Sequence, residues 1–376
     1  MNINEYISKI DRDDILIHIP HNLTDENACI DNVVLLISHE LSRTGSSIQL
    51  LFMTKALQML GYHPFVFSLS GGDLINDFMD IDVPVICGVD PEITSEWIDK
   101  LTDGFDIIFI NTLTMVGYVR YLVKQSKHVF WWIHENSYWF KNDCITDIPF
   151  SPRLTILAAS EKTKEHIKLY MKRESTLLNV CVEDKCVCEK HQSEKITFIW
   201  SGTLDNNKAP DVLLEALLHL PNELTQRTEF LIVGHDRTND RYSELVKSIA
   251  VKLPFVRLMN AMDHSDFLKL MDEVDSVIVT SIEETTSMVA VEGFMKGKIV
   301  ICSEGCGVAR YMEDKINGFV FKTCDSKMLS EIIKYVIDNI SDLEYIMHSG
   351  RLLYEKHYLF DSFKSNLENI LREIDL

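Results

Sequence analysis

The sequence predicts an α/β protein made of two doubly wound domains. The chain has 376 residues, which exceeds the size at which a single hydrophobic core keeps growing, so two domains are expected. Short apolar segments alternate with amphipathic ones in two separate series, and such alternation indicates parallel strands joined by crossover helices. Charged residues and cysteines interrupt the pattern over residues 177–194, which separates the two series.

The first series predicts a domain over residues 1–185. A helix is expected over 46–60, because apolar residues recur on one face and Gly61 follows the last of them. A second helix is expected over 161–172. The apolar segments that predict strands are 32–37, 64–69, 106–110, 128–133 and 154–158.

The second series predicts a domain over residues 186–355. Its expected strands are 195–201, 230–233, 276–280 and 299–302, and its expected helices include 210–220 and 242–253. The tail, residues 356–376, has apolar residues at Phe360, Phe363, Leu367 and Leu371. This spacing predicts a terminal helix that packs back on the first domain.

Composition excludes several classes of function. The net charge of −20 argues against duplex nucleic acid as a partner, because phosphate backbones require a basic face. No segment is apolar enough to span a bilayer, and the polar N-terminus does not resemble a targeting peptide. Nine cysteines without a regular framework indicate reduced thiols, so we expect a cytoplasmic protein. Cys181, Cys186 and Cys188 lie near His191, but the spacing matches no standard zinc site and no metal is expected.

Two glutamates eight positions apart, Glu284 and Glu292, are the most informative residues. The strand at 276–280 leads into a polar turn that contains Glu284, and Thr285, Thr286 and Ser287 could cap the helix that follows. Glu292 would then lie about two turns inside this helix, roughly 12 Å along its axis. Carboxylates that accept sugar hydroxyls, beside helix amides that bind phosphate, suit a sugar nucleotide. The alternative is a pair of solvated surface glutamates.

Two loops of the first domain could also bind a ligand. Gly45 lies in SHELSRTGSS, where it lets the backbone approach a ligand and where Ser46 and Ser47 could cap a helix. His134 follows the strand in WWIHENSYW, at the strand end where ligands gather, and could bind a sugar hydroxyl or transfer a proton. The aromatic residues of this segment are either core residues or sugar-stacking faces.

In the second domain, WSGTLDNNKAP combines a glycine turn with a lysine just before a helix. Gly202 and Lys208 together are a sensible clamp for a diphosphate, although a lysine at a loop end is commonly just solvated.

Taken together, these segments resemble family four of the retaining glycosyltransferases, which have the GT-B fold of two facing Rossmann-like domains with a cleft between them. The resemblance runs from about residue 33 to the end and is most specific in EETTSMVAVEGFMKGKIVICSEGCG. It implies a metal-independent hexosyltransferase that uses a nucleotide-sugar donor, most often a UDP- or GDP-sugar, and no further cofactor.

The resemblance also implies roles for individual residues. Glu292 would bind the ribose hydroxyls of the nucleotide, Glu284 the transferred sugar, and Lys208 the diphosphate. His134 would lie near the 6-position of the sugar and the reaction centre, and Gly45 would let its loop approach donor and acceptor. The further donor-binding positions are Gly202, Thr203, and the amides of Thr286, Ser287 and Met288.

Several positions differ from the family pattern. Thr203 stands where an arginine commonly adds a second cation on the diphosphate, and Thr285–Ser287 replaces a Gly-Phe-Gly sequence. Ala309 and Arg310 replace a Pro-Glu pair. Arg310 or Arg43 could supply the missing charge.

The expected function is retaining glycosyl transfer to a saccharide, lipid-linked or protein acceptor, in bacterial surface glycan or glycoprotein assembly. A non-catalytic subunit of a transferase complex and a sugar-nucleotide epimerase are the alternatives. Peripheral association with the inner face of the membrane and the oligomeric state are left open.

Overall fold

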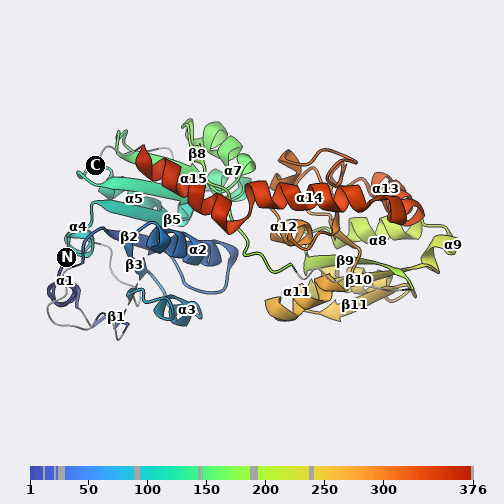
Figure 1. Ribbon diagram of the computed structural model, residues 1–376, viewed down its shortest axis with the longest axis horizontal. Helices are drawn as coiled ribbons and strands as arrows, with labels where there is room; N and C mark the ends of the chain where they lie inside the picture. Colours follow the sequence, from blue (N-terminus) through green and yellow to red (C-terminus); the bar gives the residue numbers. More distant parts are fainter. Residues whose placement is uncertain are drawn as a thin grey trace. The chain divides into compact units, whose positions relative to one another are not determined.

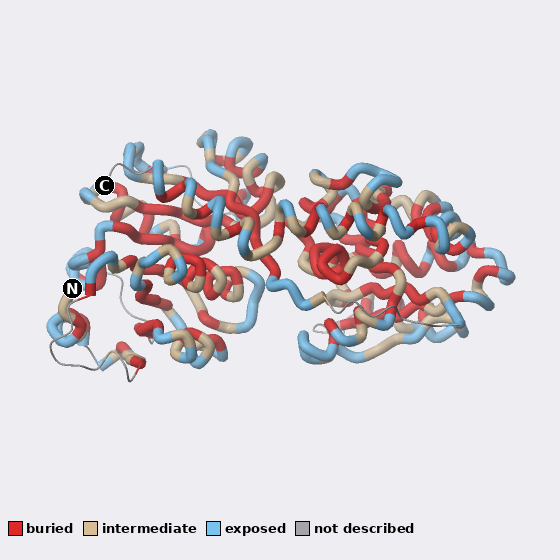
Figure 2. The backbone as a smooth tube through the Cα atoms, in the orientation of Figure 1, coloured by how far each residue is buried: buried red, intermediate tan, exposed pale blue. Residues whose placement is uncertain are grey.

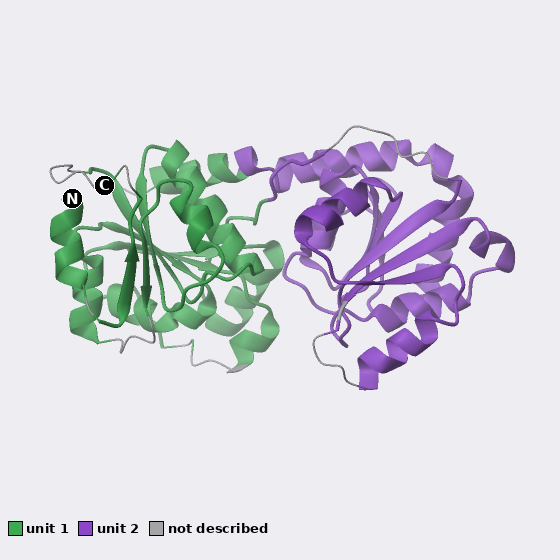
Figure 3. Cartoon of the chain, turned by 90° about the horizontal axis from the view of Figure 1, so that it is seen from below, with its two compact units in different colours: residues 1–181, 363–376 green, residues 182–362 purple. Residues whose placement is uncertain are grey.

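A computed structural model of the chain describes residues 1–11, 13–20, 23, 30–88, 94–142, 145, 147–186, 194–236 and 241–373 (Figure 1). The chain forms two compact units (Figure 3). Unit 1 consists of Met1–Cys181 with Phe363–Leu376, and unit 2 of Val182–Ser362. The division falls after Cys181, where the sequence suggested residue 185.

Unit 1 contains an eight-stranded sheet in the order β1-β4-β3-β2-β5-β6-β7-β8. Only β1 runs antiparallel to its neighbour, β4. The order reverses between β2 and β5, which makes their carboxyl ends the topological switch point of the sheet. The strands are β1 (Ile15–His18), β2 (Val33–Ser38), β3 (His63–Ser68), β4 (Val85–Gly88), β5 (Ile107–Asn111), β6 (His128–Ile133), β7 (Leu154–Ala158) and β8 (Thr176–Leu177).

Figure 3 shows helices on both sides of this sheet, which is why the central strands are apolar on both faces. Buried backbone follows the strands (Figure 2). The helices of unit 1 are α1 (Ile3–Ile10), α2 (Gly45–Met59), α3 (Ile75–Met79), α4 (Ser95–Thr102), α5 (Val116–Leu122), α6 (Ser137–Asn142), α7 (Glu161–His166), which continues as a π-helical turn (Ile167–Met171), and most of α15 (Phe360–Arg372).

Unit 2 contains a six-stranded sheet, all parallel, in the order β11-β10-β9-β12-β13-β14. Its order reverses between β9 and β12. The strands are β9 (Ile196–Thr203), β10 (Thr228–His235), β11 (Val256–Asn260), β12 (Ser276–Val279), β13 (Ile299–Ser303) and β14 (Phe319–Phe321). The helices are α8 (Pro210–Leu218), α9 (Asn222–Thr225), α10 (Arg241–Ala250), α11 (His264–Asp272), α12 (Met288–Met295), α13 (Ser326–Asn339) and α14 (Glu344–His357).

The nine predicted strands are all present, and the two α/β domains with parallel sheets are confirmed. The prediction missed β11 because its sequence, VRLMN, is only partly buried and carries polar residues. It also missed the short strands β1, β4, β8 and β14. The C-terminal helix α15 begins at Phe360, and Phe363 packs in unit 1 with its ring 5.6 Å from that of Trp132.

No helix in the described part of the chain has the length and apolar character needed to span a bilayer.

Candidate functional site

Polar side chains gather at the switch point of each sheet, where ligands of open α/β sheets bind. In unit 2 they follow β9 and β12, and in unit 1 they follow β2, β5 and β6. The sequence-predicted residues fall into these two groups.

Lys208 and Glu284 form an ion pair in unit 2. The Lys208 Nζ lies 2.8 Å from Glu284 Oε1, and both side chains are largely buried. Ser281 Oγ donates a short hydrogen bond to the same carboxylate oxygen. Burial alone would lower the pKa of Lys208, but the charge and hydrogen bond of Glu284, with Cys306 and Asp205, outweigh it and raise the pKa. The ammonium therefore stays charged, and its charge is already matched by Glu284.

The backbone of Glu284 is fixed by a second loop. Glu284 N–H donates to Gly305 O at 3.1 Å, and Gly307 N–H donates to Glu284 O at 3.0 Å. The two loops approach so closely that a Cβ on Gly305 would lie 2.1 Å from Ile282 O, and one on Gly307 would lie 1.7 Å from Thr285 O. Both glycines are thus required by the packing that positions this carboxylate.

The turn after β9 holds Lys208 from the other side. The Lys208 N–H donates to Asp205 Oδ1, and its carbonyl oxygen accepts from Thr280 Oγ1, both at 2.8 Å. Gly202 faces the lysine stem, where a Cβ would lie 3.3 Å from Lys208 Cγ. Thr203 ends β9 beside it. Gly202 therefore lies in β9 and not in the turn that the sequence predicted, but it does face Lys208.

The start of helix α12 differs from the expected cap. The helix begins at Met288, and its N-cap Ser287 has φ 86° and makes no side-chain capping bond. The prediction that Thr285, Thr286 or Ser287 caps the helix by its hydroxyl is therefore wrong, because the chain enters through a left-handed residue. In the described part of the chain, the amides of Thr286, Ser287 and Met288 donate no hydrogen bond to protein.

Glu292 lies one turn inside α12, not two, because the helix starts later than expected. Its buried carboxylate accepts from His264 Nε2 at 2.6 Å. Both residues line a pocket of about 250 Å³ together with the apolar side chains of Val233, Phe267 and Met288. The hydrogen bond to Glu292 raises the pKa of His264, although burial and the charge of Lys185 oppose this. The site thus pairs a carboxylate with an apolar wall.

A second pocket, of about 330 Å³, lies beyond the ends of β10 and β11. Asp236 and Lys247 form an ion pair at its wall, next to Gly234 and Asn260.

In unit 1, His134 is held by Asn111 across two strand ends. His134 Nε2 lies 2.9 Å from Asn111 Oδ1, while Asn111 Nδ2 donates to Ser46 O at 3.1 Å. Because this second bond fixes the amide orientation, His134 must carry its proton on Nε2 and present Nδ1 as an acceptor. Burial, and to a lesser extent His39, lower the pKa of His134 to about 3. The neutral ring suits hydrogen bonding to a hydroxyl rather than proton transfer near neutral pH.

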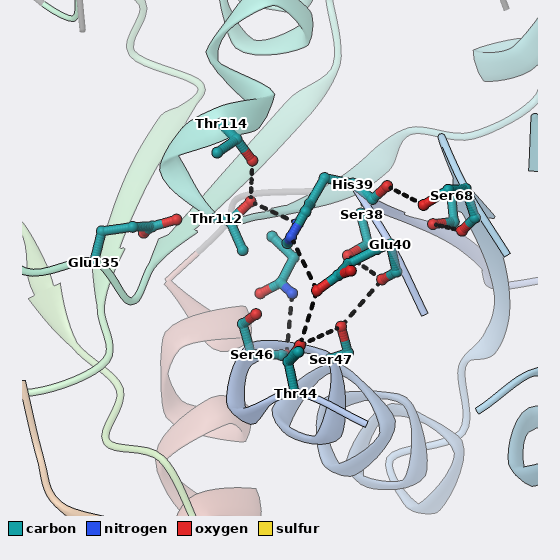
Figure 4. Close-up of polar contacts among 12 residues, drawn as sticks. Ser38, His39, Glu40, Thr44, Ser46, Ser47, Ser68, Thr112, Thr114 and Glu135 are labelled. Atoms are coloured by element: carbon teal, nitrogen blue, oxygen red, sulfur yellow. Dashed lines mark hydrogen bonds and ion pairs between the residues drawn. The ribbon is translucent and has the colours of Figure 1, made fainter. Parts of the chain in front are cut away.

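Thr112 stands at the centre of this group (Figure 4). Its φ of 74° and ψ of 157° lie in a region that is essentially reserved for glycine. The strained backbone is tied to β6, since Thr112 N–H donates to Trp132 O at 2.9 Å and Thr112 O accepts from Trp131 Nε1 at 2.8 Å. The Thr112 hydroxyl then lies 3.3 Å from His39 Nδ1 and 2.8 Å from Thr114 Oγ1.

Glu135 ties the two strand ends together. Its carboxylate accepts from Leu113 N–H at 2.7 Å and from His134 N–H at 2.8 Å. Glu135 therefore fixes the amide of His134 and the backbone that follows β5.

Helix α2 begins at Gly45, and Thr44, not Ser46 or Ser47, is its N-cap. The Thr44 hydroxyl bonds Glu40 Oε1 at 3.1 Å instead of capping the helix (Figure 4). A Cβ on Gly45 would meet nothing within 4 Å, so the fold itself does not require glycine there.

The aromatic residues of WWIHENSYW divide into two kinds. Trp131 and Trp132 are fully buried and belong to the core, so they offer no face to a ligand. Tyr138 and Trp139 on α6 are exposed. Arg43, considered above as a second cation, is paired with Asp77 at 2.7 Å.

Sequence reasoning missed His39, Asn111, Thr112, Glu135 and His264. Asn111 and Thr112 directly follow an apolar strand, the same signal that pointed to His134, so they could have been found. His264 had no such signal, because its contact with Glu292 spans 28 residues. Among the described residues, no group of three or more His, Cys, Asp or Glu is placed to hold a metal ion. Cys188 and His191 lie outside the described residues.

Two family models match the chain. Glycosyl transferases group 1 matches residues 187–353, and Glycosyl-transferase family 4 matches residues 31–196. A curated relative from Campylobacter jejuni, GalNAc-alpha-(1->4)-GalNAc-alpha-(1->3)-diNAcBac-PP-undecaprenol alpha-1,4-N-acetyl-D-galactosaminyltransferase, is 29% identical over 109 residues. That match spans 29% of this chain and 30% of the relative, so it covers less than a third of the relative's length.

Solved structures share the fold. A glycosyltransferase from Rickettsia africae aligns with a TM-score of 0.75 at 17% identity, covering 92% of this chain and 99% of that one. Anabaena HepE in complex with UDP and glucose aligns at 0.74 and 15% identity, covering 91% and 99%. The two family models together cover residues 31–353. The chain therefore belongs to the group 1, family 4 glycosyltransferases, and its two α/β units with parallel sheets are those of the GT-B fold.

Proposed function

We propose that the protein transfers a sugar from a nucleotide donor to a hydroxyl of a lipid-linked glycan, with retention of the anomeric configuration. Two relatives support this proposal. The Campylobacter jejuni relative is named as a transferase that acts on an undecaprenol-linked glycan. HepE from Anabaena was solved with UDP and glucose bound. A UDP-sugar or a GDP-sugar is the proposed donor.

Lys208 and the start of α12 would receive the diphosphate of the donor. Lys208 supplies a positive charge. The amides of Thr286, Ser287 and Met288 supply hydrogen-bond donors at the N-terminus of a helix. A phosphate bound here would contact the Lys208 ammonium, which already pairs with Oε1 of Glu284. The other carboxylate oxygen of Glu284 could then accept a hydrogen bond from a sugar hydroxyl. This charge would stabilise the leaving diphosphate without a bound metal ion.

Glu292 would bind the nucleoside part of the donor. A buried carboxylate accepts ribose hydroxyls well, and the apolar wall of its pocket suits a base. His264 Nε2 lies 2.6 Å from one oxygen of the Glu292 carboxylate, and this hydrogen bond orients the carboxylate for a ligand.

The reaction breaks the bond between the anomeric carbon and the leaving phosphate oxygen and forms a bond to the acceptor oxygen on the same face. The proton of the acceptor hydroxyl passes to the leaving phosphate. His134 would accept a hydrogen bond from the sugar through Nδ1, because its pKa of about 3 keeps it neutral. It is not proposed as the base.

The single observation that carries the proposal is the Lys208–Glu284 pair, fixed by two loops at the switch point of unit 2. One observation favours a second candidate, a non-catalytic glycosyltransferase-like subunit. Glu284 already matches the charge of Lys208, and Thr203 adds no second cation.

The test is a transfer assay with the purified full chain. UDP- and GDP-sugars are offered with a polyprenyl-diphosphate saccharide, and proton NMR reads the anomeric configuration of donor and product. The proposal expects transfer with the same configuration in both. It also expects Glu284→Gln to lose at least about a hundredfold in kcat/KM, the scale of a transition-state contact.

Glu273→Gln is the matched control, because this glutamate is exposed at the C-cap of α11. It should leave the rate unchanged. Product of inverted configuration would refute retention, whereas donor binding with no transfer would favour the non-catalytic subunit. Conversion of the donor without acceptor would indicate an epimerase.

A further inference from the structure

The carboxylate of Glu292 is a buried acceptor with room for more hydrogen bonds than it makes. Its side chain is 7% exposed, and among the described residues the one side chain that donates to it is His264, whose Nε2 lies 2.6 Å from Oε1. An ionised carboxylate offers about four acceptor positions. Because a buried charge with few partners is costly, a ligand that brings hydroxyl groups into the pocket gains from meeting Glu292.

His264 is placed to yield to such a ligand. Its side chain is 62% exposed at the wall of the same pocket, so the imidazole can turn toward solvent without disturbing the core. His264 is also the first residue of α11, where the positive end of the helix dipole disfavours an imidazolium. The contact with Glu292 therefore holds the ring in place, and weakening that contact sets the ring free.

The charges around His264 come from three segments of the chain. Glu292 on α12 raises the pKa of His264, chiefly through the hydrogen bond, while partial burial and Lys185, from the segment before β9, lower it. On the histidine's own helix, Asp263 is the N-cap, and Asp266 is engaged by a lysine of the same helix. Glu292 is thus the contact that favours the protonated imidazole, and its loss favours the neutral ring.

A nucleoside would weaken this contact in two ways. The 2′- and 3′-hydroxyls of ribose lie on adjacent carbons and donate side by side, so they share the oxygens of Glu292 with His264. A base against Phe267 and Met288 covers the imidazole from water, and desolvation disfavours its charge. The diphosphate acts the other way, but it would bind beside Lys208 at the start of α12, about 6 Å along the helix from Glu292. The direct contacts therefore outweigh it.

We propose that His264 and the nucleoside of the donor compete for Glu292, so that the donor binds with release of a proton from the imidazole to solvent. In the free protein, His264 orients the carboxylate and balances its charge. As the ribose binds, the contact between the two side chains weakens and the neutral ring remains. Because protons favour the free protein, donor affinity falls as pH falls. This inference rests on the proposed nucleotide site and adds the sign of its pH dependence.

Isothermal titration of UDP-glucose and GDP-mannose into the full chain, without acceptor, tests the proposal. The diphosphate of both probes is esterified at each end, so neither probe has a phosphate proton to lose near neutral pH. Titration in two buffers with different heats of ionisation counts the protons released. The wild type should release a fraction of a proton at about pH 7. Its Kd should rise at least about threefold from about pH 8 to about pH 6, since one linked proton changes affinity by at most about tenfold per pH unit.

His264→Gln is the informative variant, because an amide nitrogen can donate to Glu292 as Nε2 does but takes up no proton. It should bind the same probe without proton release and with a Kd that does not change with pH. His348→Gln, at an exposed histidine of α14, is the matched control and should behave as the wild type does. Proton uptake or no proton exchange by the wild type, or release that persists in His264→Gln, would overturn the proposal and leave the nucleotide site standing. Binding of neither probe would overturn both. The wild-type pH series decides the sign even where the variant folds poorly.

Discussion

At the scale of single residues, the Glu292–His264 pair links protonation to the candidate nucleotide site. The carboxylate is buried and the imidazole largely exposed, and Glu292 raises the pKa of His264 above its usual value against the opposing effects of partial burial and Lys185. Asp263, at the cap of α11, and Asp266 are the neighbouring acidic groups on the histidine's own helix. Protonation of His264 therefore strengthens its contact with Glu292. A ligand bound to Glu292 has to share the carboxylate with His264.

This pair predicts how stability depends on pH. Because the folded pKa of His264 is raised, the pair contributes stability in full below the unfolded pKa of about 6.5, and the contribution is lost as pH rises through the folded pKa. The difference in melting temperature between wild type and Glu292→Gln should therefore be larger in acid than in alkali. A scan of both proteins across pH checks this, with Glu273→Gln as control. A constant difference would contradict it.

Thr112 predicts an unusual order of two substitutions. Thr112→Gly and Thr112→Ala both remove the hydroxyl contacts with His39 and Thr114, but only alanine keeps the strain of φ 74°. Glycine normally costs about 0.5–1 kcal/mol more than alanine in extended chain. Here Thr112→Gly should be the more stable variant, by about 1 kcal/mol, because the strained region costs 1–3 kcal/mol.

Urea unfolding of the two variants measures this difference. Thr176 in β8 is exposed and has ordinary backbone, so Thr176→Ala should be more stable than Thr176→Gly. The same order at both positions would show that Thr112 carries no strain.

The sequence predicted some of these residues and not others for a physical reason. Glu284, Lys208 and His134 lie directly beside apolar strands or helix starts, so the local pattern points to them. His264 meets Glu292, and Thr112 meets His39, only through contacts between segments 28 and 73 residues apart. The mutual pairing of Lys208 and Glu284 was likewise invisible, since the sequence shows two charges but not that they face each other.

At the scale of elements, the loop that carries Gly305 and Gly307 sets the position of the turn before α12. Long apolar strands and glycine-stopped helices were predictable because burial imposes a periodic pattern. The start of α12 was not, because Ser287 takes a left-handed conformation that a hydroxyl residue rarely adopts.

Gly307→Ala should therefore disturb the site from a distance. Its Cβ would lie 1.7 Å from Thr285 O, so the backbone that holds Glu284 must shift. We expect a loss of about 2 kcal/mol or more in the free energy of unfolding. Gly45→Ala is the control, because its Cβ meets nothing within 4 Å and alanine suits a helix start. Equal melting temperatures for the two variants would contradict this packing.

At the scale of the whole molecule, each unit repeats one design. The strand order β4-β3-β2-β5-β6-β7 of unit 1 corresponds to β11-β10-β9-β12-β13-β14 of unit 2. The strand order reverses between β2 and β5 in unit 1 and between β9 and β12 in unit 2. In both units, polar residues follow the strands at that point. The family assignment agrees with this architecture, since the two matching family models divide the chain near residues 187–196.

The central claim is that the switch point of unit 2 binds the nucleotide of a sugar donor, and isothermal titration of UDP and GDP into the full chain tests it most directly. We expect one of the two nucleotides to bind, with Lys208→Met and Glu292→Gln each weakening it at least about tenfold, the loss expected for one charge-assisted hydrogen bond. Lys269→Met, at an exposed lysine of α11, should bind as the wild type does. Binding of neither nucleotide, or equal affinity in all four proteins, would contradict the account.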